Sequence, residues 1–313
     1  MTKHPPLIYS LTLLAAGALA TGPTWADTGK LLLTGGVSSV EGAAGGGITP
    51  WAVIGSNATA DEVGASVSVS RLNTRDYGLT SYSAAFGFGE RLELSLGEQD
   101  FNASPAVALN GLGFNVANGQ HIKMTIVGAK VRVAGDAVLD SDSLMPQIAI
   151  GLQHKSTNAG TLRPVLDFLN AKTSGTDLYA SATKLLLAQG LLLNATLRYT
   201  NANQGGLLGF GSAAPGRNSR SLQPEFSVAY LLSKNVAIGA EYRFMPNNLE
   251  ALGRAAGLGN ALRQDHWKDL FIAWAPNKNV SITAAYVDLG RVVPGVTGNR
   301  RQSGLFLSTQ WAF

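Results

Sequence analysis

The sequence contains no cysteine, and charged residues make up only 14% of its 313 residues. The absence of cysteine excludes a disulfide framework, a thiolate metal site and a cysteine nucleophile. Soluble domains carry about 25% charged residues, so this low fraction is unusual for a protein that faces water on its whole surface. The formal net charge of +4 is too small an excess to indicate a nucleic-acid partner.

The chain also lacks long apolar runs beyond its N-terminus. After residue 26 it has no stretch of about 18 uninterrupted apolar residues, which excludes a helical inner-membrane protein. Residues 1–26 are typical of a signal peptide, with a weakly basic start, an apolar core at 7–20 and a small-x-small site at 24–26. We therefore expect export, removal of residues 1–26 and a mature chain from Asp27.

What the sequence does have is strand alternation, clearest at its C-terminal end. Every second residue of 305–313 is apolar or threonine, and the chain stops on the aromatic Phe313. An ordinary last strand of a soluble sheet is one interpretation, but an unpaired apolar edge invites aggregation. A closed outer-membrane barrel has no edge and faces lipid with alternate residues. Such barrels commonly end in a phenylalanine strand, so we expect the barrel-assembly machinery to bind this segment.

The same alternation, with β-branched and aromatic enrichment, recurs along the chain. Most of the segments have close to the 9–11 residues that a tilted strand needs to cross the hydrocarbon. The expected fold class is therefore all-β, a transmembrane antiparallel β-barrel of about 12 strands over residues 62–313. The predicted strands are 63–72, 77–87, 90–99, 121–133, 146–155, 176–187, 191–201, 223–232, 235–244, 267–275, 279–289 and 303–313.

Three segments depart from this rhythm. In 121–133 the polar residues lie at odd-numbered positions up to Thr125 and at even-numbered positions from Lys130. This change of face predicts a β-bulge near 126–128. Residues 182–193 read either as a helix or as a hairpin that turns at 188–190. The Gly-rich residues 27–61 form either an N-terminal extension or plug, or two further strands at 31–40 and 48–56 that make fourteen. We expect twelve strands and the extension.

The connections alternate in length along the chain. Outer-membrane barrels combine long extracellular loops with short periplasmic turns, so this alternation predicts that both chain ends are periplasmic. The long connections are 100–120, 156–175, 202–222, 245–266 and 290–302, and the short ones are 87–89, 188–190, 233–234 and 276–278.

Several segments resemble an uncharacterised family. FGERLELSLGEQDF, PQIAIGLQHK, SVAYLLSKNVAIGAEYR and WKDLFIAWAPNKNVSITAAYVDLG are similar to domain of unknown function 3034, found in Gram-negative bacteria and generally described as outer-membrane proteins. The resemblance covers nearly the whole mature chain. It implies a barrel in the cell outer membrane and no established activity, so it supplies no functional residues.

Charged residues opposite the apolar stripes are expected to point into the lumen, because a charge on the lipid face costs about 2–4 kcal/mol at the midplane. Arg198, Glu225 and Glu241 or Arg243 would be neighbours, and Glu93 would meet Lys130 and Arg132. Either these residues line a pore and set its selectivity, or they bridge the wall and close a narrow barrel. The lumen-lining candidates are Lys130, Arg132, Lys155, Asp177, Arg198, Glu225, Glu241, Arg243 and Asp269.

Aromatic residues near strand ends are expected to contact outer-membrane lipid at the interface. Apolar residues in two long loops indicate either an entrance for a hydrophobic substrate or a packed loop plug. The interface aromatics are Tyr199, Tyr230, Tyr242, Phe244, Trp274, Tyr286, Trp311 and Phe313, and the loop residues are Val107, Leu109, Leu112, Phe114, Leu207, Leu208 and Phe210.

No enzyme motif is present. His121, His154 and His266 lie outside any nucleophile motif, and no two of them have a metal-binding spacing. We expect no catalysis, no metal and no cofactor. The sequence predicts a channel or transporter for a small-molecule solute. A non-conducting structural or adhesive barrel is the alternative, and an outer-membrane lipid hydrolase is disfavoured.

Overall fold

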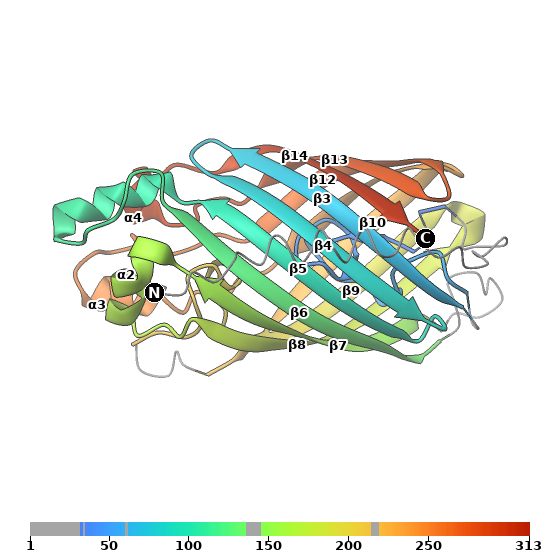
Figure 1. The fold of residues 1–313 in the computed structure, drawn as a ribbon, viewed down its shortest axis with the longest axis horizontal. Helices are drawn as coiled ribbons and strands as arrows, with labels where there is room; N and C mark the ends of the chain where they lie inside the picture. The colour runs from blue at the N-terminus through green and yellow to red at the C-terminus, as the bar shows by residue number, and fades with distance from the viewer. Residues whose placement is uncertain (1–31, 34, 60–61, 136–144, 214–218) are drawn as a thin grey trace, which may run out of the picture.

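The computed structural model describes residues 32–33, 35–59, 62–135, 145–213 and 219–313. The predicted signal peptide, residues 1–26, lies outside this part. Twelve strands form one closed antiparallel barrel (Figure 1). Each strand pairs with its neighbours in sequence, and the first, β3, closes the ring by pairing with the last, β14. The predicted twelve-stranded barrel is thus confirmed.

The strands begin and end within about three residues of their predicted bounds. They are β3 (Val63–Thr74), β4 (Gly78–Phe88), β5 (Leu92–Asn102), β6 (His121–Ala134), β7 (Gln147–Asn158), β8 (Ser174–Leu186), β9 (Leu191–Thr200), β10 (Ser221–Ser233), β11 (Val236–Arg243), β12 (Trp267–Asn277), β13 (Val280–Asp288) and β14 (Ser303–Ala312).

Two alternatives from the sequence are wrong. Residues 182–193 form the end of β8, a turn and the start of β9 rather than a helix, and the turn ends at Gly190 with a φ of +63°. The two extra strands needed for fourteen do not join the barrel. Among the described residues of the extension, β1 (Val37–Ser38) and β2 (Ala44–Gly45) pair with each other and with no strand of the barrel.

The barrel wall is apolar on its outer surface. Leu270 is 67% exposed and Leu305 is 70% exposed, and alternate residues of the other strands are likewise exposed hydrophobics. Hydrocarbon offers no hydrogen-bond partners, so a closed barrel that pairs every strand suits this apolar exterior. No helix in the described part of the chain is both long enough and apolar enough to cross a membrane.

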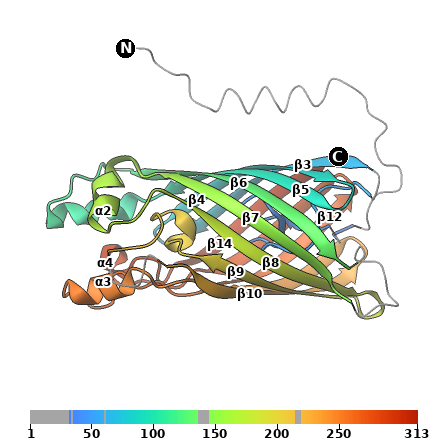
Figure 2. The ribbon, with the colours of Figure 1, turned by 90° about the horizontal axis from the view of Figure 1, so that it is seen from below.

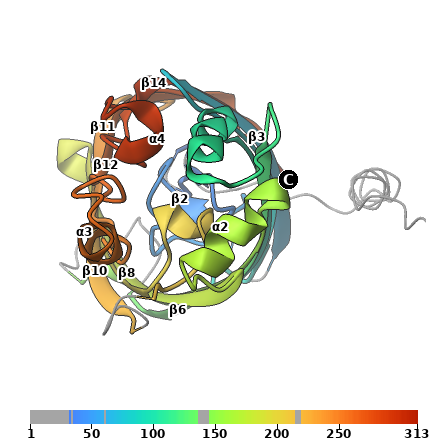
Figure 3. The same cartoon turned by 90° about the vertical axis from the view of Figure 1, so that its left-hand side faces the viewer.

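The two ends of the barrel differ (Figures 1 and 2). At the short-turn end, β4 and β5, β8 and β9, β10 and β11, and β12 and β13 are joined by brief turns. At the long-loop end, the connections carry short helices that surround the mouth (Figure 3). These helices are η1 (Ser104–Leu112), η2 (Gly160–Leu162), α2 (Arg163–Phe168), η4 (Gln204–Gly206), α3 (Glu250–Ala255) and α4 (Pro294–Thr297), while η3 (Leu187–Gln189) lies at a short turn.

The bulge predicted near 126–128 is wrong. β6 keeps one register with β5 and β7 through this stretch, and its only shift lies between Arg132 and Ala134. Ile122, Met124 and Ile126 are buried inside the barrel, in a cluster with loop residues. The inward-facing residues of β6 change from apolar to polar along the strand. The reason is that the barrel interior is apolar at the long-loop end and polar towards the short-turn end.

Residues 35–59 lie inside the barrel and are named the plug here. Figure 3 shows β2 near the centre of the ring of strands. Most plug residues are buried, including Trp51, Val53 and Ile54. Trp51 and Val53 pack with Leu185 and Leu192 of the wall. A separate segment of the chain therefore fills the lumen.

Replacing Ile272 with arginine tests the lipid-facing surface. Ile272 lies midway along β12 and is 46% exposed on the outer face. We expect Ile272→Arg to lower the free energy of unfolding by about 2–4 kcal/mol, because a guanidinium at the hydrocarbon midplane loses its hydration. Urea unfolding in lipid vesicles measures the change. The control Ile272→Leu should unfold like the parent protein, and equal stability of the arginine variant would contradict a membrane-spanning wall.

Candidate functional site: a plugged lumen

The inner face of the wall is lined with small hydroxyl side chains. Pairs of them hydrogen-bond across neighbouring strands, with oxygen–oxygen distances of 2.7 Å between Ser68 and Ser83 and 2.8 Å between Ser70 and Ser308. Such short side chains cannot reach across the lumen. The buried inward-facing serines and threonines include Ser66, Ser68, Ser70, Ser81, Ser83, Ser95, Ser181, Thr183, Thr196, Ser227, Thr283 and Ser308.

Wall side chains hydrogen-bond the backbone of the plug. Thr196 Oγ1 donates to the carbonyl of Pro50 at 2.7 Å, and the N–H of Ala52 donates to Thr183 Oγ1 at 2.8 Å. Lys130 Nζ donates to the carbonyl of Ala44 at 2.9 Å. These contacts come from β6, β8 and β9, and Ser81 of β4 and Gln310 of β14 hydrogen-bond the plug from another part of the wall. They satisfy buried backbone groups that would otherwise need water.

The plug approaches the wall closely at Gly46, where a Cβ would force the Glu241 carboxylate to move. A Cβ there would lie 2.1 Å from Glu241 Oε1. The Glu241 carboxylate accepts hydrogen bonds from the N–H of Ile48 at 2.9 Å and from Thr49 Oγ1. Ser227 Oγ donates to the same carboxylate at 3.0 Å. The glycines of this segment thus allow a wall carboxylate to contact the plug backbone.

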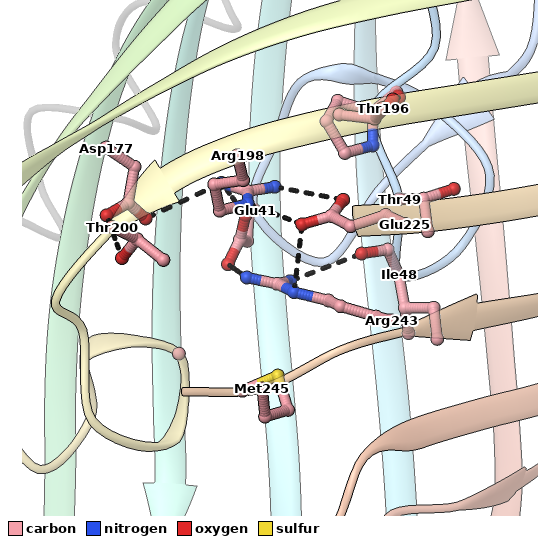
Figure 4. A network of polar contacts seen from close by, with 12 residues as sticks. Glu41, Ile48, Thr49, Asp177, Thr196, Arg198, Thr200, Glu225, Arg243 and Met245 are labelled. Atoms are coloured by element: carbon pink, nitrogen blue, oxygen red, sulfur yellow. Dashed lines mark hydrogen bonds and ion pairs between the residues drawn. The ribbon is translucent and has the colours of Figure 1, made fainter. Parts of the chain in front are cut away.

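A buried ionic cluster joins the plug to three strands (Figure 4). Glu41 of the plug accepts from Lys155 Nζ at 2.7 Å and from Arg243 Nη2 at 2.9 Å, and Arg198 Nη1 lies 3.3 Å from its other oxygen. These cations come from β7, β11 and β9.

Two wall carboxylates complete this cluster. Arg198 Nε donates to Glu225 Oε1 at 2.5 Å, and Arg243 Nε lies 3.4 Å from the same oxygen. Lys155 Nζ lies 2.9 Å from Asp177 Oδ2. The cluster therefore contains three cations and three carboxylates, all buried. Removing one member would leave an uncompensated charge away from water.

The other charged candidates lie elsewhere in the lumen. Lys130 pairs with Glu93 at 3.1 Å, next to the plug. The prediction that Arg132 would join them is wrong, because its guanidinium instead donates to the carbonyls of Glu90 and Gly135 at the short-turn end. Asp269 lies directly opposite Glu241 on the neighbouring strand, and both are buried.

The interface aromatics lie on the outer face of the barrel in two groups, one near the long-loop end and one near the short-turn end. Tyr199, Tyr242 and Tyr286 are exposed near the ends of strands that lead into long loops, with Phe244 stacked on Tyr242 at a ring-centroid distance of 4.9 Å. The second group, near the short-turn end, comprises Tyr230, Trp274, Trp311 and the partly exposed Phe313. Two such girdles are typical of a barrel that spans a bilayer.

Between the plug and the long loops, the lumen contains an apolar cavity of about 510 Å³. Loop residues Leu109, Leu112 and Phe114 line it, as do Leu207 and Leu208. Phe210 is 1% exposed and does not line this cavity. Five of the seven apolar loop residues noted in the sequence therefore surround an open space, and Val107 and Phe210 do not line it.

The long-loop end is held by ion pairs between loops. Arg300 Nη2 donates to Asp76 Oδ1 at 2.7 Å, and Gln302 Nε2 donates to Asp76 Oδ2 at 2.6 Å. The hydrogen bond from Arg300 holds the pKa of Asp76 below its ordinary value. Asp265 accepts from the backbone N–H of Arg291 at 3.0 Å, which joins two further loops.

Glu41 is the functional residue that the sequence analysis missed. It lies in a Gly-rich segment with no strand periodicity, so no pattern indicated where its side chain would point. The available signal was its isolation, since Glu41 is the only charged residue between Lys30 and Asp61. The segment around Glu41 is otherwise uncharged and enters a lumen with excess cations. Its lone carboxylate is therefore a candidate for an ion pair with a cation of the wall.

Metal binding finds no support in the described ranges, where no three His, Asp or Glu residues gather to hold an ion. His121 pairs with Asp100, and His154 Nδ1 lies 2.9 Å from Thr176 Oγ1. Both histidines are exposed.

The chain belongs to the family described as "Protein of unknown function (DUF3034)", whose model matches residues 34–310. No curated protein matches the sequence. Among solved structures, the KdgM porin in complex with disordered oligogalacturonate is similar at 10% identity and a TM-score of 0.48, covering 79% of this chain and 99% of the porin. The NanC porin matches with the same identity and TM-score, covering 79% of this chain and 98% of its own.

An outer membrane phospholipase A from Escherichia coli is also similar, at 9% identity and a TM-score of 0.40, covering 80% of this chain and 92% of its own.

Replacing Glu41 with glutamine tests the ionic cluster. Glu41→Gln leaves three cations against two carboxylates, and breaking a buried pair in this way costs about 3–5 kcal/mol. We expect the amides of residues 38–52 to exchange hydrogen faster, while the barrel strands remain protected. The control is Glu98→Gln, a glutamate of β5 on the opposite face to buried Gln99. Unchanged exchange in the Glu41 variant would show that the cluster does not hold the plug.

Proposed function

We propose that this member of the family is an outer-membrane channel or transporter for small molecules, closed by its plug. The observation that carries the proposal is how the lumen is filled. The inner wall presents short hydroxyl side chains, and a separate segment occupies the space between them. If the plug moves, the part of the wall around it is left with a polar lumen, as in barrels that conduct.

The contacts that hold the plug can be exchanged for water. Many of them are hydrogen bonds or ion pairs to wall side chains, and hydroxyls and charged groups are readily hydrated. Apolar contacts also hold the plug, where Trp51 and Val53 pack near β8 and β9 and where Val40 packs with Leu72, Leu79 and Phe306. A plug held in large part by polar groups is suited to reversible displacement into an aqueous lumen.

The proposal places the long-loop end outside the cell and both ends of the chain in the periplasm. Outer-membrane lipid contacts the apolar belt, and the C-terminal strand is offered to the barrel-assembly machinery. No catalytic step is proposed. A structural or adhesive role would fit the same barrel if the plug never leaves the lumen.

A disulfide between plug and wall tests the proposal. Thr49 Oγ1 and Ser227 Oγ lie 2.5 Å apart, and the chain has no cysteine of its own, so Thr49→Cys/Ser227→Cys would introduce a single possible bond. In planar bilayers we expect the oxidised double variant to remain closed, and reductant to restore openings. For each single-cysteine variant, the conductance at a given voltage should be the same with and without reductant.

The variant with a weakened plug completes this experiment. Glu41→Gln should increase the open time, because its plug has lost the cluster's central carboxylate. Silence of both the parent protein and Glu41→Gln at all voltages would overturn the channel and favour a structural or adhesive role. Lipid hydrolysis by the purified protein in detergent would instead favour an enzyme.

A further inference from the structure

The apolar cavity lies between the plug and the long loops. Its volume of about 510 Å³ is in the range of sites that bind small molecules. Gly47 and Ile48 of the plug contribute to its lining, and inward residues of the wall such as Ala285 and Phe306 form part of its sides. A molecule in this cavity would therefore touch the plug directly.

The mouth of the cavity is apolar as well. Leu112 is 64% exposed, Phe168 is 65% exposed and Leu258 is 43% exposed, and all three line the cavity. They come from three different loops at the long-loop end. Exposed apolar side chains gathered at one opening are typical of a binding site for an apolar partner.

The charge of the lining limits what can bind. Among the described residues, the lining contains no lysine or arginine, and its ionisable groups are the carboxyls of Glu241 and Asp269 and the phenol of Tyr77. An anion would lose its hydration without gaining a cation in return. The cavity thus disfavours carboxylates and phosphates.

Three polar atoms in the cavity-lining residues lack a hydrogen-bond partner within the described part of the chain. They are Gln204 Oε1, Trp267 Nε1 and Asp269 Oδ1. Buried polar atoms in folded proteins usually have a partner. All three atoms are closed off from solvent in this structure, so a ligand hydroxyl bonds one of them only after a lining side chain rotates.

We propose that this cavity binds a small, uncharged, mainly apolar molecule with one hydrogen-bonding group. The cavity takes the molecule from the mouth at the long loops and holds it above Gly47 and Ile48. That this ligand is also the transported solute rests on the proposed function, whereas its binding does not.

Binding of 1-naphthol to the mature protein in lipid nanodiscs tests the proposal, with naphthalene and 1-naphthoate as comparisons. Ala285→Phe places a ring in the cavity and should weaken 1-naphthol binding about 10-fold or more. Ala284→Phe makes the same change on the same strand but faces lipid, and should bind like the parent. Equal affinity of the two variants would show partition into lipid and overturn the site.

A second variant tests the polar group without filling the cavity. Trp267→Phe keeps an aromatic ring and removes the unpartnered N–H. It should weaken 1-naphthol about 3- to 10-fold, the effect of one hydrogen bond, and leave naphthalene unchanged. The parent should bind 1-naphthoate at least about 10-fold more weakly than 1-naphthol. Equal binding of 1-naphthoate would overturn the preference for uncharged ligands.

Failure of this proposal and failure of the channel are distinguishable. If 1-naphthol does not bind but Glu41→Gln conducts, the cavity is not a ligand site and the channel stands. If 1-naphthol binds with the expected variant pattern to a protein that is silent in bilayers, the site stands and the channel does not.

Discussion

Three cations project into one region of the lumen, from β7, β9 and β11. Within ion-pair distance, the described residues of the wall provide them with two carboxylates, Asp177 and Glu225. Glu41 provides the third. An unpaired charge in a dry interior is strongly destabilising, so the plug adopts the position in which Glu41 reaches all three cations. The hydrogen bonds from the wall to the plug backbone depend on that placement.

The plug also separates two chemically different halves of the lumen. Towards the long loops the wall presents Ile122, Met124 and Phe306, and towards the short turns it presents hydroxyls such as Ser66 and Thr183. An apolar molecule is favoured in the first compartment, and water in the second. In the proposed channel, the plug lies at the boundary between these two compartments and would control passage between them.

The lipid face explains why so much of the fold could be predicted from sequence. Hydrocarbon requires every second residue to be apolar, and this requirement located all twelve strands. No comparable rule governs the interior. The predicted bulge in β6 assumed a polar lumen throughout, and it is wrong because Ile122 and Met124 face an apolar cluster. Pairing of the inward charges could be estimated from strand register, but the role of Glu41 could not, because glycine-rich segments carry no periodicity.

The ionic cluster sets a condition on any ligand that opens the barrel. A ligand shifts an equilibrium only by its difference in affinity for the two states, and an apolar molecule gains nothing from the charges themselves. It can act at Ile48, whose N–H and carbonyl are hydrogen-bonded by Glu241 and Arg243. Arg243 also binds Glu41, so displacement of Ile48 disturbs the cluster at one of its members. In the proposed open state, water in the serine-lined lumen would hydrate the separated charges. The free-energy difference between the closed and open states would then be much smaller than the sum of the broken contacts.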